Sequence, residues 1–211
     1  MASDTARRQR AGYHHGDLRA ALLAAAEQEL IEKGVEGFSL RGVAKRAGVS
    51  HAAPAHHFRD TKDLLTALAA LAARRFRDAM LDRQLQAPRN ARSQFIASGL
   101  GYVEFALANP ALFDLMFGSK RPDFASEDFS TPASEAFMVL VEGVAALRGD
   151  DPLTLAEGRA EILAAWSLVH GLAELLIAGR LAFAEADLAA DREGTILRAI
   201  ERALPLGGKT C

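Results

Sequence analysis

Residues 39–58 read SLRGVAKRAGVSHAAPAHHF, and this segment is the most informative part of the chain. Four apolar residues in it recur at three- and four-residue intervals, which is the spacing of one buried helical stripe: Leu40, Val43, Ala44 and Ala47. Gly48 follows directly, and a glycine can adopt the left-handed backbone that ends a helix. The pattern therefore predicts a short helix that stops at Gly48.

A second helix is expected to begin just after this glycine. Ser50 can cap it, and the small Ala44 side chain lets the two helices cross closely. Pro54 would be the fourth residue of a helix capped by Ser50, where it lacks the N–H for the first intrahelical bond; a start one residue later avoids this conflict. The segment thus predicts a helix-turn-helix.

The rest of the chain predicts an all-α fold, because apolar residues follow the helical period and no persistent alternation indicates a strand. Besides the helix-turn-helix, the expected helices cover residues 18–34, 61–85, 91–109, 111–118, 132–148, 152–178 and 186–204. Asp17 and Asp60 are placed to cap two of them, and the pairs Thr131-Pro132 and Asp151-Pro152 to start two more. Pro88 is expected to break the long helix, and residues 120–130 to form a loop. We predict two domains, residues 1–60 and 61–211.

Composition narrows the class of protein. The chain has 211 residues, of which 50% are hydrophobic and 25% charged, so it is neither disordered nor fibrous. Its only cysteine is Cys211, which excludes a disulfide framework and a thiolate metal site. No apolar run follows the early arginines, so no signal peptide is expected, and the cytoplasm is the expected compartment. Residues 162–177 are the most apolar stretch but too short for a membrane span, and we predict a buried helix there.

Charge is divided unevenly along the chain. Residues 1–80 hold 13 Lys and Arg against 9 Asp and Glu, a net charge of +4, whereas residues 81–211 hold 12 against 18, a net charge of −6. Five of the six histidines also precede residue 58. A basic N-terminal part followed by an acidic remainder is typical of a protein that binds phosphate groups through one surface. Helical surfaces also often carry such a charge imbalance by chance.

The chain resembles the TetR family of transcriptional regulators. Across residues 13–71, the motifs YHHGDLRAALLAAA, GFSLRGVAKRAGVS, HHF and DLL stand in the family's order and spacing. Further on, YVEFALANPALFDLMFG and AWSLVHG resemble the subgroup whose C-terminal domain is named for a Trp-His-Gly motif, here Trp166, His170 and Gly171. The resemblance implies an N-terminal DNA-binding domain and a larger helical domain for ligand binding and dimerisation.

The start of the second helix of a helix-turn-helix enters the major groove, which here would place His51, Ala52 and Ala53 against base edges. The candidate DNA-binding residues are Ser39, Arg41, Ser50, His51, Ala52, Ala53, His56, His57 and Lys62. Arg41 suits a guanine or a phosphate, and the two serines can meet phosphate oxygens or act only as helix caps. For His56 and His57, a position on the solvated surface is as good an interpretation as DNA contact. For Lys45 and Arg46, the solvated surface is the preferred interpretation. The Arg7, Arg8 and Arg10 arm could reach a minor groove or be disordered.

Two positions depart from the family pattern. Ala55 stands where a phosphate-contacting tyrosine is usual, and Thr61 where a lysine usually contacts the DNA backbone; Lys62 could replace the latter. Because phosphate contacts give affinity and register rather than sequence information, their loss should weaken binding more than redirect it.

The resemblance implies that the larger domain holds a ligand pocket, and that the helices at 152–178 and 186–204 form a homodimer. The effector of such a pocket is expected to be small and hydrophobic. The candidate ligand-binding residues are Tyr102, Phe105, Met116, Phe117, Phe137, Trp166 and His170, with Phe95 and Met138 as further apolar candidates. Plain core packing is the alternative for each aromatic residue, and a satisfied core histidine for His170. Trp166 and His170 are four residues apart and so share a helix face.

The functional hypothesis is a repressor that binds a palindromic double-stranded operator as a homodimer and is released by its ligand. We expect no enzyme activity, cofactor or metal, because the chain has no inward Glu-x-x-His pairs, P-loop or H-E-x-x-H motif. The alternative is a dimeric protein that binds small molecules or partners and whose DNA reading is weakened, since Ala55 and Thr61 replace usual anchors.

Overall fold

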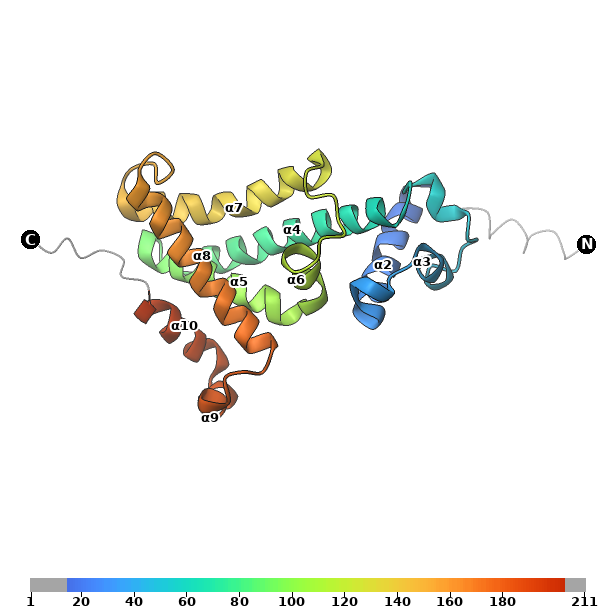
Figure 1. Cartoon of the computed structure of the whole chain (residues 1–211). Coiled ribbons are helices and arrows are strands. Elements are labelled where there is room, and N and C mark those ends of the chain that lie inside the picture. The colour runs from blue at the N-terminus through green and yellow to red at the C-terminus, as the bar shows by residue number, and fades with distance from the viewer. Residues whose placement is uncertain (1–14, 204–211) are drawn as a thin grey trace, which may run out of the picture.

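The computed structural model describes residues 15–203. Every regular element in that range is helical, which confirms the all-α prediction. The elements are α2 (His15–Gly37), α3 (Leu40–Arg46), the 3₁₀ turn η1 (Ala53–His56), α4 (Thr61–Gln86), α5 (Ala91–Ala108), α6 (Pro110–Phe117), α7 (Glu127–Arg148), α8 (Ala156–Ile177), η2 (Ala182–Ala184), α9 (Glu185–Ala190) and α10 (Arg192–Ala203). Figure 1 shows α2 and α3 at one end of the long α4, with α8 and α10 toward the other end. The predicted arm at residues 7–10 and the end of the last helix at Leu204 lie outside the described residues.

The first helix of the predicted helix-turn-helix forms as expected. Ser39 caps α3, because its Oγ accepts a hydrogen bond from the Gly42 N–H at 3.1 Å. Val43 and Ala44 are buried on one stripe, and Gly48 has a left-handed φ of 68°. The stop at Gly48 is therefore confirmed. The preceding helix α2 starts at His15, three residues before the prediction, and is kinked at Gly34, where we expected it to end.

The second helix of the motif differs from the prediction. It is a 3₁₀ turn over Ala53–His56, preceded by Ala52, and no side chain caps it. The expected Ser50 cap is thus wrong; instead, the Ser50 carbonyl accepts a hydrogen bond from the Ala53 N–H at 3.0 Å. Pro54 explains the change, because it has no N–H to donate to that carbonyl four residues earlier. The backbone therefore forms a 3₁₀-type hydrogen bond between residues three apart, from the Ala53 N–H to the Ser50 carbonyl.

Helix α4 contacts both the helix-turn-helix and the larger helical part of the chain. The Asp60 side chain caps it by accepting the Asp63 N–H at 2.8 Å, and it ends at Gln86 before Pro88, as predicted. Leu64, Leu65 and Leu68 are fully buried. Because α4 packs against α2 at its start and against α5, α6 and α7 later, it joins the helix-turn-helix to the larger helical part.

Helix α7 begins at Glu127 rather than near residue 132, so Pro132 lies inside the helix. The additional turn buries Phe129, whose ring packs edge-on against Phe124 at 4.9 Å between centroids. Pro132 removes the N–H that would have bonded to the Asp128 carbonyl, and Asp128 is exposed, so water can satisfy it. Burial of an aromatic ring therefore decided the start of this helix, which the Thr131-Pro132 pair did not predict.

Two further boundaries correct the predictions. Helix α8 starts at Ala156, because the Asp151 side chain accepts the Leu153 N–H at 2.9 Å and closes a turn instead of opening a helix. The expected last helix is divided into α9 and α10 at Asp191, whose side chain accepts the Gly194 N–H at 2.9 Å. The end of α8 is as predicted, since Gly179 has a left-handed φ of 62°.

Helix α8 was expected to be buried, and this is wrong for much of its surface. Leu163 is 65% exposed, Leu175 45% and Trp166 37%. The expectation that the apolar stretch is too short for a membrane span is also wrong, because α8 has 22 residues and is long and apolar enough by length and composition; the core helix of a soluble protein meets the same criterion. The chain therefore presents an apolar helix face to its surroundings.

Candidate DNA-binding surface and internal cavity

Most predicted DNA-binding side chains lie on the surface around α3 and η1. The exposed ones are Ser39, Arg41, Ser50, His51, Ala52, His56 and Lys62, whereas Ala53 and His57 are half-buried. Ala55 is exposed and Thr61 is half-buried. Figure 1 shows that α3 lies at the end of the molecule farthest from α8 and α10, so this surface is separate from the exposed apolar face.

A buried carboxylate clamps α3 onto α2. Arg46 Nε donates to Glu29 Oε2 at 2.6 Å, and the same guanidinium holds Glu32 in a two-pronged pair. The Glu29 side chain is only 6% exposed. The hydrogen bond from Arg46 lowers the pKa of Glu32, and the two carboxylates raise the pKa of Arg46. Arg46 and Lys45 are both exposed, as expected, but Arg46 also has a structural role because it holds α3 on α2.

Gly42 belongs to the same clamp. A Cβ atom at this position would lie 1.9 Å from Glu29 Oε1, so any other residue would force the carboxylate to move. Glu29 and Arg46 are 17 residues apart, and no local pattern in the sequence links them. The clamp was consequently missed by sequence reasoning.

The segment between α6 and α7 contacts α2 of the helix-turn-helix part and the start of α4. Arg121 Nη1 donates to the Val35 carbonyl at 2.7 Å, and Lys62 Nζ lies 3.1 Å from Asp123 Oδ2. The Asp123 N–H also donates to Thr66 Oγ1 at 2.8 Å, and Lys62 lowers the pKa of Asp123. Lys62, the predicted replacement for the missing backbone-contacting lysine, is thus already paired with a carboxylate.

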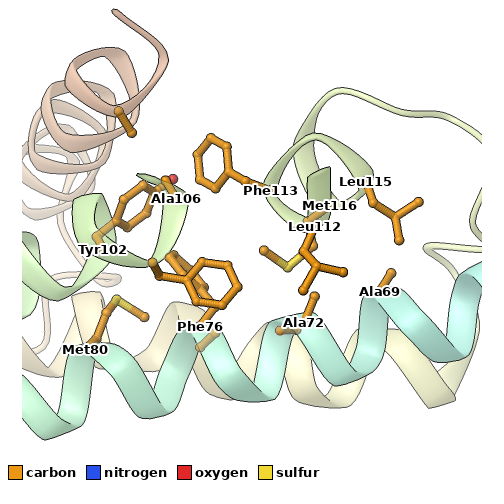
Figure 2. Packing of buried hydrophobic residues seen from close by; sticks show 14 of the residues in the cluster. Ala69, Ala72, Phe76, Met80, Tyr102, Ala106, Leu112, Phe113, Leu115 and Met116 are labelled. Carbon is orange, nitrogen blue, oxygen red and sulfur yellow. The ribbon is translucent and has the colours of Figure 1, made fainter. Parts of the chain in front are cut away.

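A cavity of about 300 Å³ lies in the larger helical part. It is lined from α4, α5, α6, α7, α8 and α10 and by Phe124 of the segment before α7. Its aromatic lining residues are Phe76, Phe95, Tyr102, Phe117, Phe124, Phe129, Phe137 and Trp166. Figure 2 shows Phe76 and Met80 projecting from α4 toward Tyr102 of α5. The volume is at the lower end of the range for small-molecule sites.

Five of the predicted ligand-binding residues line this cavity: Tyr102, Met116, Phe117, Phe137 and Trp166. Phe105 does not; it is buried and packs on Phe76 at 5.3 Å between ring centroids. Of the two further candidates, Phe95 lines the cavity and Met138 is exposed, because neighbouring helical residues such as Phe137 and Met138 point to different faces.

Sequence reasoning missed Phe76, Met80, Phe129 and Ile200, which also line the cavity. The four-residue spacing of Phe76 and Met80 placed them on one face of α4, and this signal could have identified that pair. Phe129 could not be identified in this way, because it was assigned to a loop.

Two of the lining residues, Tyr102 and Trp166, belong to a hydrogen-bonded cluster with His170. Tyr102 Oη lies 2.8 Å from His170 Nδ1, and Trp166 Nε1 donates to Tyr102 Oη at 3.3 Å. Since the indole N–H can only donate, the Tyr102 hydroxyl is satisfied when it donates its proton to His170. Burial raises the pKa of Tyr102, so the phenol stays neutral. His170 lies beside the cavity and lines a shallow groove with Phe117, Trp166 and Ser167.

Within residues 15–203, no group of three or more His, Cys, Asp or Glu side chains is placed so that it could hold a metal ion.

Two family models match the chain. Residues 22–68 match the model described as bacterial regulatory proteins of the tetR family, and residues 95–199 match the tetracyclin repressor-like C-terminal domain. No curated protein shows significant similarity. The Trp-His-Gly subgroup stays a prediction.

Several solved structures share the fold. A protein with unknown function from Rhodococcus sp. RHA1 is 35% identical, with 89% of this chain and 97% of that chain covered and a TM-score of 0.72. A TetR family transcription regulator from Marinobacter aquaeolei VT8 is 19% identical, with 93% and 96% covered and a TM-score of 0.63. The TetR family transcriptional regulator PfmR from Thermus thermophilus is 17% identical, with 89% and 99% covered and a TM-score of 0.61. The last two show the likeness of fold alone.

Proposed function

The chain belongs to the TetR family of bacterial regulatory proteins, and from this premise we propose that it is a cytoplasmic repressor that binds a palindromic operator as a homodimer and is released by a small hydrophobic ligand. The observation that carries the proposal is the clamped helix-turn-helix. Glu29 and Arg46 hold α3 on α2, while most of the side chains proposed to meet DNA remain exposed.

Each exposed group has a chemical role in this proposal. His51 can exchange a hydrogen bond with a base edge, and the Ala52 methyl group can pack against a thymine methyl. Arg41 offers a fork of donors to a guanine or a phosphate. Ser39 Oγ already accepts the Gly42 N–H, but its own hydroxyl proton is free to be donated to a phosphate oxygen. Phosphate contacts fix the register and the base contacts specify the sequence.

The exposed face of α8 supports the homodimer. Leu163, Trp166 and Ile177 are spaced so that they share one stripe of the helix, and all three are exposed. Large apolar patches on a soluble protein usually mark an interaction surface, and a twofold dimer covers the same patch on both copies. Helix α10 packs beside α8 and buries Ile196 and Ile200 inward, which leaves its other face for the partner copy.

The segment between α6 and α7 gives a physical route from ligand to DNA. Phe124 lines the cavity, and its neighbour Asp123 pairs with Lys62 at the start of α4. A ligand that displaces the Phe124 ring would therefore act on the contacts that hold the helix-turn-helix part. A dimer reads two half-sites about 34 Å apart, so a small change in the separation of its two reading surfaces prevents both from binding together. The ligand can shift this equilibrium only by its different affinities for the two states.

A mobility-shift titration tests the proposal. The purified full-length chain is mixed at low salt with a labelled fragment of the DNA that adjoins its own gene, and an unlabelled fragment of scrambled sequence serves as the competitor. We expect one retarded complex that contains two chains and that the scrambled competitor does not displace. Its affinity should fall steeply as the salt concentration rises. Absence of binding at low salt would contradict the proposal.

Two observations favour a second candidate, a dimeric binding protein whose DNA reading is weak. Ala55 is exposed but carries no hydroxyl group, and η1 has only four residues. This candidate predicts only weak retardation of the labelled fragment. An unlabelled scrambled fragment should remove it as easily as an unlabelled copy of the labelled fragment does.

A further inference from the structure

The cavity walls offer no charge to a ligand. None of the nineteen lining residues is Asp, Glu, Lys, Arg or His. The lining polar side chains are Ser98, Tyr102 and Trp166, apart from backbone groups. A charged molecule in this space would lose its hydration and meet no opposite charge.

The polar groups of the wall are already satisfied. Ser98 Oγ donates to the Phe95 carbonyl at 2.8 Å, and Tyr102 is held between His170 and Trp166. Within the described residues, no buried side-chain nitrogen or oxygen lacks a hydrogen-bond partner. Among the described residues, the cavity therefore has no unpaired side-chain donor that could recognise a carboxylate.

The apolar walls, in contrast, consist largely of aromatic side chains that contact one another. Phe76 meets Tyr102 edge-on at 4.7 Å between centroids and Phe117 at 6.0 Å, and Phe137 meets Trp166 at 5.7 Å. The two Phe76 contacts are edge-to-face, which is a favoured geometry between aromatic groups, and Phe137 is tilted by 49° against Trp166. A flat ring inserted among these side chains can make further contacts of this kind. A cation would gain attraction from the ring faces, but this recovers only part of its lost hydration where no carboxylate lines the space.

We propose that the effector of this cavity is an uncharged molecule with a flat aromatic ring system, and that anionic and cationic molecules of the same shape are rejected. The assignment rests on the proposed function, because it takes the cavity as the effector site. It adds the charge class of the ligand, which the family membership does not give.

Three probes of matched shape test the charge class: 2-naphthol, 2-naphthoate and 2-naphthylmethylammonium, which are neutral, anionic and cationic at pH 7. Binding to the full-length chain is measured by calorimetry. We expect 2-naphthol to bind at least tenfold more tightly than either ion. Equal or tighter binding of an ion, or no binding of 2-naphthol up to its solubility limit, would overturn the inference.

A pair of neighbouring residues on α7 locates the bound probe. Phe137 lines the cavity and Met138 is exposed, so Phe137→Ala should change 2-naphthol affinity several-fold and Met138→Ala should leave it unchanged. If both variants bind as the parent does, the probe lies outside the cavity and the inference fails. Thermal unfolding of both variants checks that they fold.

A parallel mobility-shift assay separates this inference from the proposed function. If 2-naphthol binds in the cavity but leaves the DNA complex intact, the ligand class stands and ligand relief fails. If an ion binds more tightly and releases the DNA, ligand relief stands and the ligand class fails.

Discussion

The substitution Gly42→Ala should disrupt the clamp between α2 and α3. The new Cβ would lie 1.9 Å from Glu29 Oε1, and the two other carboxyl atoms are within 2.8 Å, so the carboxylate must move. Its side chain is 6% exposed and bonded to Arg46 Nε, which leaves little freedom for this movement. Overpacking of this kind usually destabilises a protein by about 1–3 kcal/mol.

The replacement also has a favourable part. Alanine in a helix is about 0.5–1 kcal/mol better than glycine, because the unfolded chain loses less entropy. The net loss for Gly42→Ala is therefore centred on about 1 kcal/mol and reaches about 2.5 kcal/mol at most. For a chain of this length, a loss of about 1 kcal/mol lowers Tm by about 2–4 °C. Urea unfolding followed by far-UV circular dichroism measures it, at one protein concentration because a dimer's stability depends on concentration.

A double-mutant cycle with Glu29→Ala isolates the cause. Without the carboxylate, Gly42→Ala meets no obstacle and should stabilise the protein by about 0.5–1 kcal/mol. The sign of the effect is thus expected to reverse between the two backgrounds. The reasoning is refuted if Gly42→Ala causes the same loss of stability whether or not Glu29 is present.

Three more predictions concern function. Arg41→Ala should weaken operator binding about tenfold or more in fluorescence anisotropy and leave Tm unchanged, because Arg41 is exposed; unchanged affinity would remove this arginine from the DNA-binding surface. Leu163→Glu should convert a dimer into a monomer in light scattering, whereas Leu85→Glu, on a similarly exposed residue of α4, should not; a dimer that survives Leu163→Glu places the interface elsewhere. Asp123→Asn should release Lys62 for phosphate and raise DNA affinity several-fold with a steeper salt dependence, and an unchanged salt dependence would exclude this role.

Features set by neighbouring residues could be predicted from the sequence. Gly48 ends α3 and Asp60 caps α4 because each acts within its own turn of chain, and the local pattern contains the whole cause. Local patterns failed where a second constraint was stronger. Ser50 does not cap a helix because Pro54 removes the bond it needs, and Pro132 does not start α7 because Phe129 gains burial one turn earlier.

The site depends more on contacts between distant residues. Of the seven candidate ligand-binding residues, Tyr102, Met116, Phe117, Phe137 and Trp166 line one cavity, and Phe105 and His170 do not. Their role in ligand binding stays a prediction. The bond from Tyr102 to His170 joins residues 68 apart and the clamp from Arg46 to Glu29 joins residues 17 apart, so neither follows from spacing along one helix. Such pairs are visible only when the packing of α2 on α3 and of α5 on α8 is known.

The central claim is that two copies of this chain recognise one DNA sequence through their clamped helix-turn-helix surfaces. Fluorescence anisotropy with the operator duplex and with a scrambled duplex of the same length and composition, each over a range of salt concentrations, tests it most directly. The account predicts a preference for the operator of roughly a thousandfold or more near physiological salt, with two chains bound per duplex. Equal affinity for the two duplexes, with the same salt dependence, would contradict it.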